Sequence, residues 1–216
     1  MARVSPVFAP ALALALFLGF SDAQAFLATG GFFAAFMSGN TTRLATGFAG
    51  HDWTVFQFGL ALVLSFLVGC ILAEVAARSQ PRGREWPGMA VSAVLLAVAA
   101  LLVSYAPARF GPLPLVAAMG ALHTAARPGA AGSVHPGYPT DALVRLGQGL
   151  ADALMGIAPR GAWLPHLLIW AGFAVGAALG AMAYAREARD ALWFAALAAV
   201  AFAVWARMRR VNRTNG

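Results

Sequence analysis

The sequence predicts an all-α, polytopic membrane helix bundle of about six transmembrane helices, built as two inverted three-helix repeats. Of its 216 residues, 61% are hydrophobic and 11% are charged, and the mean hydropathy is +0.73. A soluble domain usually carries about 25% charged residues to cover its surface. The bilayer must therefore replace water around much of this chain. Apolar runs of helical length recur, and the two halves share motifs in the same order.

Six apolar segments follow one another, separated by charged or Pro/Gly-rich joints. As one helix, the first segment would measure about 45 Å, against a hydrocarbon core of about 30 Å, so we expect it to be tilted, broken or both. The fourth segment is short, and residues 140–158 are interpreted as an amphipathic or re-entrant helix beside it. The six segments are 7–36, 54–77, 87–106, 111–127, 162–185 and 190–206.

The N-terminal region is similar to a secretory signal peptide. Arg3 precedes an apolar core, and Ala23-Gln24-Ala25 has the small-x-small form of a cleavage site. A cleaved protein would become hydrophilic after this point, whereas this chain stays apolar through Met37. We therefore expect an uncleaved first span.

The basic residues predict how the protein is oriented in the membrane and do not indicate a nucleic-acid site. All of them are arginines, and most lie in the joints between apolar runs. With the N-terminus inside, about eleven arginines fall on the inner side and about four on the outer side. We expect a multi-pass protein of the bacterial inner membrane with both termini in the cytoplasm, and no binding of nucleic acid.

Residues 1–107 and 108–216 are predicted to be duplicated units. Three spans in each unit would give the halves opposite orientations, an architecture common among transporters. Three pairs of segments match in the same order: Gly19–Asp22 with Gly120–His123, Phe36–Leu44 with Tyr138–Leu146, and Phe66–Gly69 followed by Ala73 with Phe173–Gly176 followed by Gly180.

These motifs resemble those of the YoaK-type family of small bacterial integral membrane proteins, a family of unknown function. The resemblance covers nearly the whole chain and is carried by 19–23 (Gly-Phe-Ser-Asp-Ala), by 36–42 (Phe-Met-Ser-Gly-Asn-Thr-Thr) and by the Gly-Ala spacing of the second and fifth spans. The second half departs from the family pattern, which has Gln-Asn in place of Leu122-His123 and Thr-Gly-Thr in place of Thr140-Asp141-Ala142. The resemblance implies the fold class and leaves the activity open.

Asp22 is the most informative candidate, because it falls near the middle of the first apolar segment. An ionised carboxylate there costs several kcal/mol unless it faces the bundle, pairs or takes up a proton. Ser21 and Gln24 are expected to share its hydrogen bonds. Asp22 is either a proton- or cation-coupling group in a central cavity, or a structural residue that bonds another helix or caps a helix restarting at residue 23.

A second candidate is the polar stretch that follows the first apolar segment. It is either a helix break that lines a polar pocket, with its arginine able to clamp an anion, or a glycine helix stop followed by the N-cap of an amphipathic helix. The resemblance favours the pocket. Its candidate residues are Ser38, Asn40, Thr41, Thr42 and Arg43.

Second-half counterparts are His123, at the position that matches Asp22, and the pair Asp141 and Arg145. His123 titrates near neutral pH if it lines a cavity, and a histidine in a helix is otherwise simply hydrogen-bonded. Asp141 and Arg145 are four residues apart and are expected to pair, as are Glu74 and Arg78.

Small residues repeat at four-residue spacing in two spans. Such a face lets helices approach closely, so these residues are assigned to packing, and the second and fifth spans are expected to cross each other near the pseudo-twofold axis. The packing residues are Gly69 and Ala73, then Gly172, Gly176 and Gly180.

The function that we expect is secondary transport of a small solute, with Asp22 as the candidate for proton coupling. The alternative is a non-transporting membrane protein that acts as a structural or assembly partner. No catalytic residue, metal or cofactor is expected, because the sequence shows neither a convincing nucleophile nor a ligand cluster at metal spacing. The expected partners are the lipid bilayer and an unidentified solute, and a homo-oligomer stays open.

Overall fold

The structure is a computed structural model that describes residues 8–79, 85–105, 111–126, 139–157, 159, 161–187 and 190–214. Within these ranges all regular elements are helices, which confirms the all-α prediction. They are α1 (Phe8–Ala28), α2 (Met37–Ala49), α3 (Trp53–Arg78), α4 (Glu85–Tyr105), α5 (Pro112–Ala125), α6 (Pro139–Leu154), α7 (Leu164–Glu187) and α8 (Ala191–Thr214).

Four of these helices are long and apolar enough to cross a membrane: Phe8–Ala28, Trp53–Arg78, Trp86–Tyr105 and Leu164–Glu187. Two shorter apolar helices, Pro112–Ala125 and Ala191–Trp205, account for the other two predicted segments. The remaining helices, α2 and α6, are amphipathic, and few of their residues are buried.

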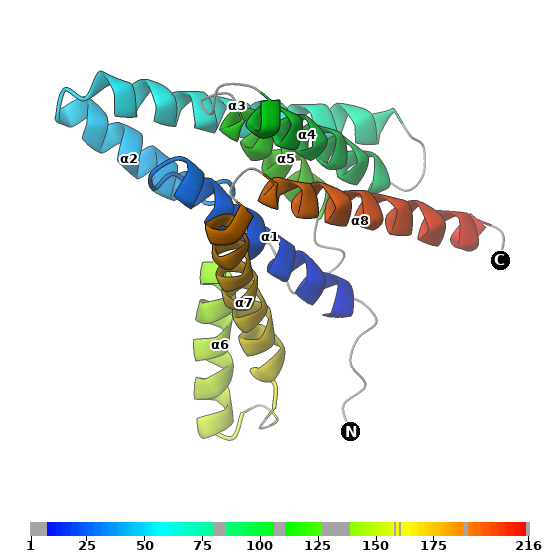
Figure 1. Ribbon diagram of the computed structural model, residues 1–216. Coiled ribbons are helices and arrows are strands. Elements are labelled where there is room, and N and C mark those ends of the chain that lie inside the picture. Colours follow the sequence, from blue (N-terminus) through cyan, green and yellow to red (C-terminus); the bar gives the residue numbers. More distant parts are fainter. Residues whose placement is uncertain are drawn as a thin grey trace.

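The helices pack mainly in pairs drawn from the two halves of the chain. α1 packs on α7, and α3 packs on α5, while α4 lies against both α5 and α8. Each amphipathic helix lies along the helix that follows it, α2 along α3 and α6 along α7. In Figure 1 the α6–α7 pair projects away from the layer that contains α3, α4 and α5.

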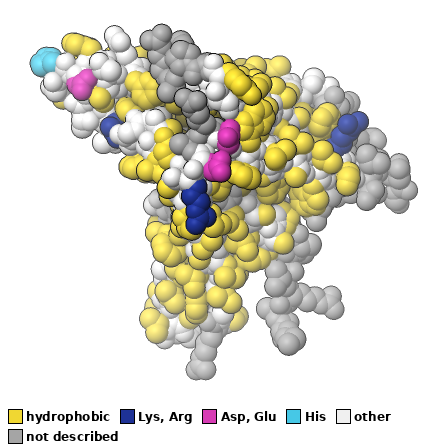
Figure 2. Space-filling model, in the orientation of Figure 1, with side chains coloured by type: hydrophobic (Ala, Val, Ile, Leu, Met, Phe, Trp, Pro, Cys, Tyr) yellow, Lys and Arg dark blue, Asp and Glu magenta, His cyan; other side chains and the backbone are white. Residues whose placement is uncertain are grey.

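The short helix α5 lies deepest in the bundle. Every residue from Leu115 to Leu122 is buried, whereas α3 exposes a broad apolar face that includes Leu64, Val68 and Val75. Figure 2 shows hydrophobic side chains over most of the visible surface and charged side chains at only a few places. An exterior of this kind matches a lipid environment, because a soluble monomer rarely exposes large contiguous apolar patches.

The glycine faces make the close helix crossings, but with other partners than the sequence suggested. A Cβ atom at Gly176 would overlap the Leu16 carbonyl of α1, and one at Gly69 would overlap the Ala117 carbonyl of α5. Gly172 and Gly180 also face α1. The expectation that the second and fifth spans cross each other is therefore wrong, because each of them crosses the first span of the opposite half.

The two crossings use equivalent residues of the two halves. In one, Gly19 faces the Phe173 carbonyl and the Ala177 amide nitrogen. In the other, Gly120 faces the Phe66 carbonyl and the Cys70 amide nitrogen. Gly19 and Gly120, and likewise Phe173 and Phe66, are the residues matched in the internal alignment. The two helix pairs therefore repeat the same contact register.

Candidate functional site

A helix break separates α1 from α2. α1 ends at Ala28, and the chain turns through Gly30 and Gly31, whose φ angles of 65° and 108° are positive. This backbone region is strained for residues with a Cβ atom and open to glycine. The break thus occupies residues 29–36. It lies earlier than expected, because Ser38 to Arg43 already form the first turns of α2.

Asp22 lies inside α1, and its carboxylate reaches across to the break. Its Oδ1 accepts a hydrogen bond from the Ala35 backbone N–H at 2.8 Å. Asp22 is only 7% exposed. Ala35 lies two residues before α2 begins, so the carboxylate lies close to the start of that helix.

The proposed helix restart at residue 23 is wrong, because α1 continues unbroken to Ala28. Asp22 caps no helix in its own sequence neighbourhood. Its carboxylate instead bonds the helix break at the Ala35 N–H, thirteen residues further along the chain. Sequence spacing alone does not reveal this contact, because it depends on how the break folds back over α1.

Asn40, in the first turn of α2, bonds the same helix break. It is completely buried, its Oδ1 accepts from the Phe33 N–H at 2.8 Å, and its Nδ2 donates to the Phe33 carbonyl at 2.8 Å. One side-chain amide thus satisfies both polar backbone groups of Phe33, which have no helix ladder to join.

Arg43 binds the glycine turn. Its Nη1 donates to the Gly30 carbonyl at 3.2 Å and to the Gly31 carbonyl at 2.5 Å. The guanidinium carbon also lies 4.3 Å from the centre of the Phe32 ring. In this arrangement the guanidinium is occupied by carbonyl oxygens and an aromatic face rather than presented to an anion.

Three other residues of the polar stretch lie on the surface of α2. The Thr41 hydroxyl donates to the Met37 carbonyl, and the Thr42 hydroxyl donates to the Ser38 carbonyl. Ser38, Thr41 and Thr42 are all exposed. The structure therefore does not bring them to Asp22.

Ser21 and Gln24 are buried beside Asp22 on α1. Gln24 Nε2 donates to the Ala191 carbonyl at 3.2 Å, which ties α1 to the start of α8. In the described part of the chain, Ser21 Oγ and Gln24 Oε1 have no hydrogen-bond partner. The expectation that Ser21 and Gln24 share the hydrogen bonds of Asp22 is therefore wrong, because Gln24 turns toward α8 while Asp22 turns toward the break.

His123, which the internal alignment matches with Asp22, lies on α5, and α5 contacts α1. Its Nδ1 lies 2.8 Å from the Met119 carbonyl, and its ring packs on Phe66 at a centroid distance of 5.6 Å. Its ring therefore adds to the packing of α5 on α3.

Comparison with known proteins identifies the family of the chain. A family model described as a protein of unknown function (DUF1275) matches residues 10–205. The chain belongs to this family.

One curated relative of this DUF1275 member is a UPF0700 transmembrane protein of Rhizobium meliloti (strain 1021). It is 32% identical over 203 residues, which cover 92% of this chain and 85% of the relative. Both names describe an uncharacterised family, and the relative's name places it in a membrane. They are compatible with the YoaK-type resemblance, although neither contains that label. No solved structure matches the chain.

Two ion pairs of this DUF1275 member join residues that lie four apart on α6 and on α3. Arg145 Nε donates to Asp141 Oδ2 at 2.7 Å on α6, and Arg78 Nε donates to Glu74 Oε1 at 2.8 Å on α3. Both pairs were predicted from their four-residue spacing and are confirmed.

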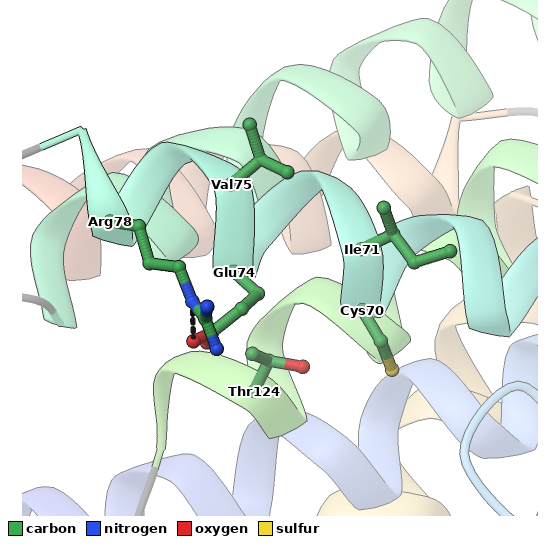
Figure 3. A pocket seen from close by; sticks show the side chains of 6 residues that line it. All are labelled: Cys70, Ile71, Glu74, Val75, Arg78 and Thr124. Carbon is green, nitrogen blue, oxygen red and sulfur yellow. Dashed lines mark hydrogen bonds and ion pairs between the residues drawn. The ribbon is translucent and has the colours of Figure 1, made fainter.

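Sequence reasoning missed two features of this DUF1275 member. Ser92 is completely buried in α4, and its Oγ has no partner among the described residues. A shallow, open depression of about 410 Å³ also lies on α3 beside Thr124 of α5 (Figure 3). The only signal for the serine was a hydroxyl inside an apolar run, and the signal for the depression was a charged pair at the end of a long span.

Proposed function

We propose that this DUF1275 member is a secondary transporter of a small solute across the bacterial inner membrane, coupled to protons through Asp22. The observation that carries the proposal is a buried aspartate inside a span, with its carboxylate bound to the backbone of a helix break. Broken helices near the middle of the bilayer are where many transporters place their substrate and coupling-ion sites.

Proton coupling would act through the hydrogen bonds between Asp22 and the break. An ionised carboxylate is stabilised by the backbone N–H group of Ala35. A proton on Asp22 removes the negative charge and weakens this attraction, so protonation would loosen the helix break from α1. Ser21 Oγ and Gln24 Oε1 would accept hydrogen bonds from the solute or from water during this step. His123 would contribute from α5, which contacts α1.

We further propose that residues 1–107 and 108–216 are the two inverted repeats. The equivalent crossings at Gly19 and at Gly120 support this division, because a twofold relation exchanges them. The first turn of α1 and the last turn of α8 lie toward the same side of the molecule, which suits two cytoplasmic termini (Figure 1). Several arginines behind that orientation, including Arg3, Arg109, Arg127 and Arg160, lie outside the described residues.

The test is uptake into proteoliposomes under an imposed pH gradient, with a panel of small neutral, cationic and anionic solutes. We expect at least one solute to enter faster with the gradient than without it. Asp22→Asn should abolish the dependence on the gradient. Asp52→Asn is the matched control, because Asp52 caps α3 at an exposed turn and asparagine caps helices equally well. Gradient-dependent uptake by Asp22→Asn equal to that of the wild type would exclude coupling through Asp22.

A non-transporting structural or assembly role is the second candidate, and one observation favours it. Asp22, Asn40 and Arg43 all bond the backbone of residues 30–35, so each has a structural task without any solute. Under this alternative, no solute in the panel enters faster than into protein-free vesicles, and Asp22→Asn changes only stability.

A further inference from the structure

One face of α1 is directed toward α8. Gln24 Nε2 donates to the Ala191 carbonyl at the start of α8, and the Phe17 ring contacts the Phe202 ring at a centroid distance of 6.1 Å. Ser21 lies four residues after Phe17 and three before Gln24, so it shares the face on which they lie. We call the contact between this face of α1 and α8 the α1–α8 seam.

The equivalent contact in the other half, between α5 and α4, is closer. The match between the two halves, continued along the helices, pairs Gln24 with Ala125. A Cβ atom at Gly88 of α4 would lie 2.8 Å from the Ala125 Cβ atom, so Gly88 takes the place that Ala191 has in the seam. From these equivalent starting points α4 packs closely along α5, whereas α8 lies mainly along α4 and makes few close backbone contacts with α1 (Figure 1).

Two phenylalanines account for the wider spacing of the seam. In the same register, Phe17 corresponds to Ala118 and Phe202 corresponds to Ala99, and both alanines are completely buried. Methyl groups allow α4 and α5 to approach each other, while two rings in an edge-to-face arrangement keep α8 away from α1. Phe17 is itself only 6% exposed, so the ring pair closes one end of the seam.

The seam contains two buried oxygen atoms that lack partners. Ser21 and Gln24 are both buried, and among the residues that the structure describes nothing bonds Ser21 Oγ or Gln24 Oε1. Because the side-chain nitrogen of Gln24 already donates to α8, the free group of this residue is an acceptor. Buried polar atoms are nearly always satisfied, so these oxygens suit a water or a solute that donates hydrogen bonds. An anion would instead face the carbonyl oxygen of Gln24.

We propose that the α1–α8 seam is the path of the solute, that the Phe17–Phe202 pair is its gate, and that it admits small solutes that donate hydrogen bonds. This inference rests on the proposed transport function. Separation of the two rings opens the seam as far as Ser21 and Gln24. The hydrogen bond from Gln24 to Ala191 lies at the opposite end of the seam and is the point about which α8 moves.

The test measures water access to position 21 in the full-length protein in detergent. Ser21→Cys combined with Cys70→Ala leaves one thiol, which reacts with methanethiosulfonate reagents as a thiolate and therefore needs water. Phe17→Ala should raise the labelling rate about tenfold, the factor that corresponds to the loss of one aromatic pair. Phe202→Ala should have the same effect, because it removes the other ring of the gate.

Two matched controls exclude a general loosening of the bundle. Ser92→Cys places the thiol at an equally buried serine of α4 and should stay unlabelled in the Phe17→Ala background. Leu12→Ala shortens a side chain of α1 that faces Gly172 of α7, and it should not raise the labelling at position 21. Unchanged labelling in both phenylalanine variants, or an equal rise in Leu12→Ala, would overturn the path and its gate.

The class of solute is tested with two reagents of similar size in the Phe17→Ala background. Relative to a free thiol, the reagent that carries an ammonium should label position 21 about fivefold faster than the one that carries a sulfonate, the ratio expected for one hydrogen bond. Gln24→Leu should remove this preference, and equal rates before that substitution would overturn the solute class. Labelling requires no transport, so its outcome is independent of the uptake test of the proposed function.

Discussion

The side-chain amide of Asn40 pairs with both backbone polar groups of Phe33, accepting from its N–H and donating to its carbonyl, each at 2.8 Å. These two hydrogen bonds attach the helix break to α2, while the hydrogen bond of Asp22 attaches it to α1. The polar residues of the two motifs therefore act together on one eight-residue segment, and their contributions can be separated by substitution.

Asn40→Leu should destabilise the protein by about 2–4 kcal/mol, because the Phe33 N–H and carbonyl would both lose their partner in a buried position. Unfolding in detergent, followed by circular dichroism during SDS titration, measures the loss. Thr41→Ala is the control and should stay within about 0.5 kcal/mol of the wild type, since Thr41 is exposed. Equal stability of the two variants would contradict the assigned role of Asn40.

Asp22→Ala should speed hydrogen exchange at the backbone amide of Ala35. The carboxylate is the acceptor for this N–H group, and alanine leaves it without one. Hydrogen-exchange mass spectrometry on peptides covering 29–36 measures the effect, with peptides from the middle of α3 as the internal reference. Unchanged exchange at Ala35 would show that the carboxylate does not hold the break.

Gly176→Val and Gly69→Val should both destabilise strongly, by more than about 3 kcal/mol, because each new side chain would overlap a backbone carbonyl of the facing helix. Since the two crossings are equivalent, the two losses should be similar. Circular dichroism during SDS titration in detergent measures both losses of stability. A large difference between the two variants would show that the crossings are not energetically equivalent.

Gly147→Ala should do the opposite and stabilise by up to about 1 kcal/mol. Gly147 lies inside α6, is exposed, and has open space where a Cβ atom would be placed. Alanine then gains helix propensity without a clash. The prediction fails if the thermal midpoint of this variant in detergent falls below that of the wild type.

Gly31→Ala should cost about 1–3 kcal/mol through backbone strain alone, because Gly31 has a φ angle of 108°. The added methyl group would also overlap the Arg43 guanidinium, so the glycine turn and the hydrogen bonds that it accepts from Arg43 should be lost together. Combining Gly31→Ala with Arg43→Ala distinguishes the two effects. If strain dominates, removing the guanidinium restores none of the lost stability.

The sequence predicted the helices and the local pairs well, because both depend on short-range patterns. Hydropathy located all six apolar segments, and four-residue spacing located the Glu74–Arg78 and Asp141–Arg145 pairs. The burial of Asp22 was also foreseen, since a carboxylate in the middle of an apolar run must find polar company inside the bundle.

The position of the break was harder to predict. Gly30 and Gly31 lie within a stretch that stays apolar to Met37, so hydropathy does not mark the end of α1. The Ser-Gly-Asn-Thr-Thr stretch suggested the break because it is polar and directly follows an apolar segment. In fact the stretch is helical, and Asn40 and Arg43 project back onto the preceding turn.

The partners of the glycine faces could not be deduced either. A row of small residues shows that a helix is approached closely, but it does not identify the approaching helix. Gly69 faces α5, and Gly176 faces α1. Only the three-dimensional arrangement reveals that each half supplies the packing partner of the other.

This exchange of partners constrains how the chain assembles during synthesis. Only α4 separates α3 from α5 along the chain, so their crossing can form while the ribosome is still translating the later helices. α1 is made first, yet its main partner α7 is made almost last. α1, with its buried aspartate, must therefore wait in the insertion machinery or in lipid until α7 has been synthesised.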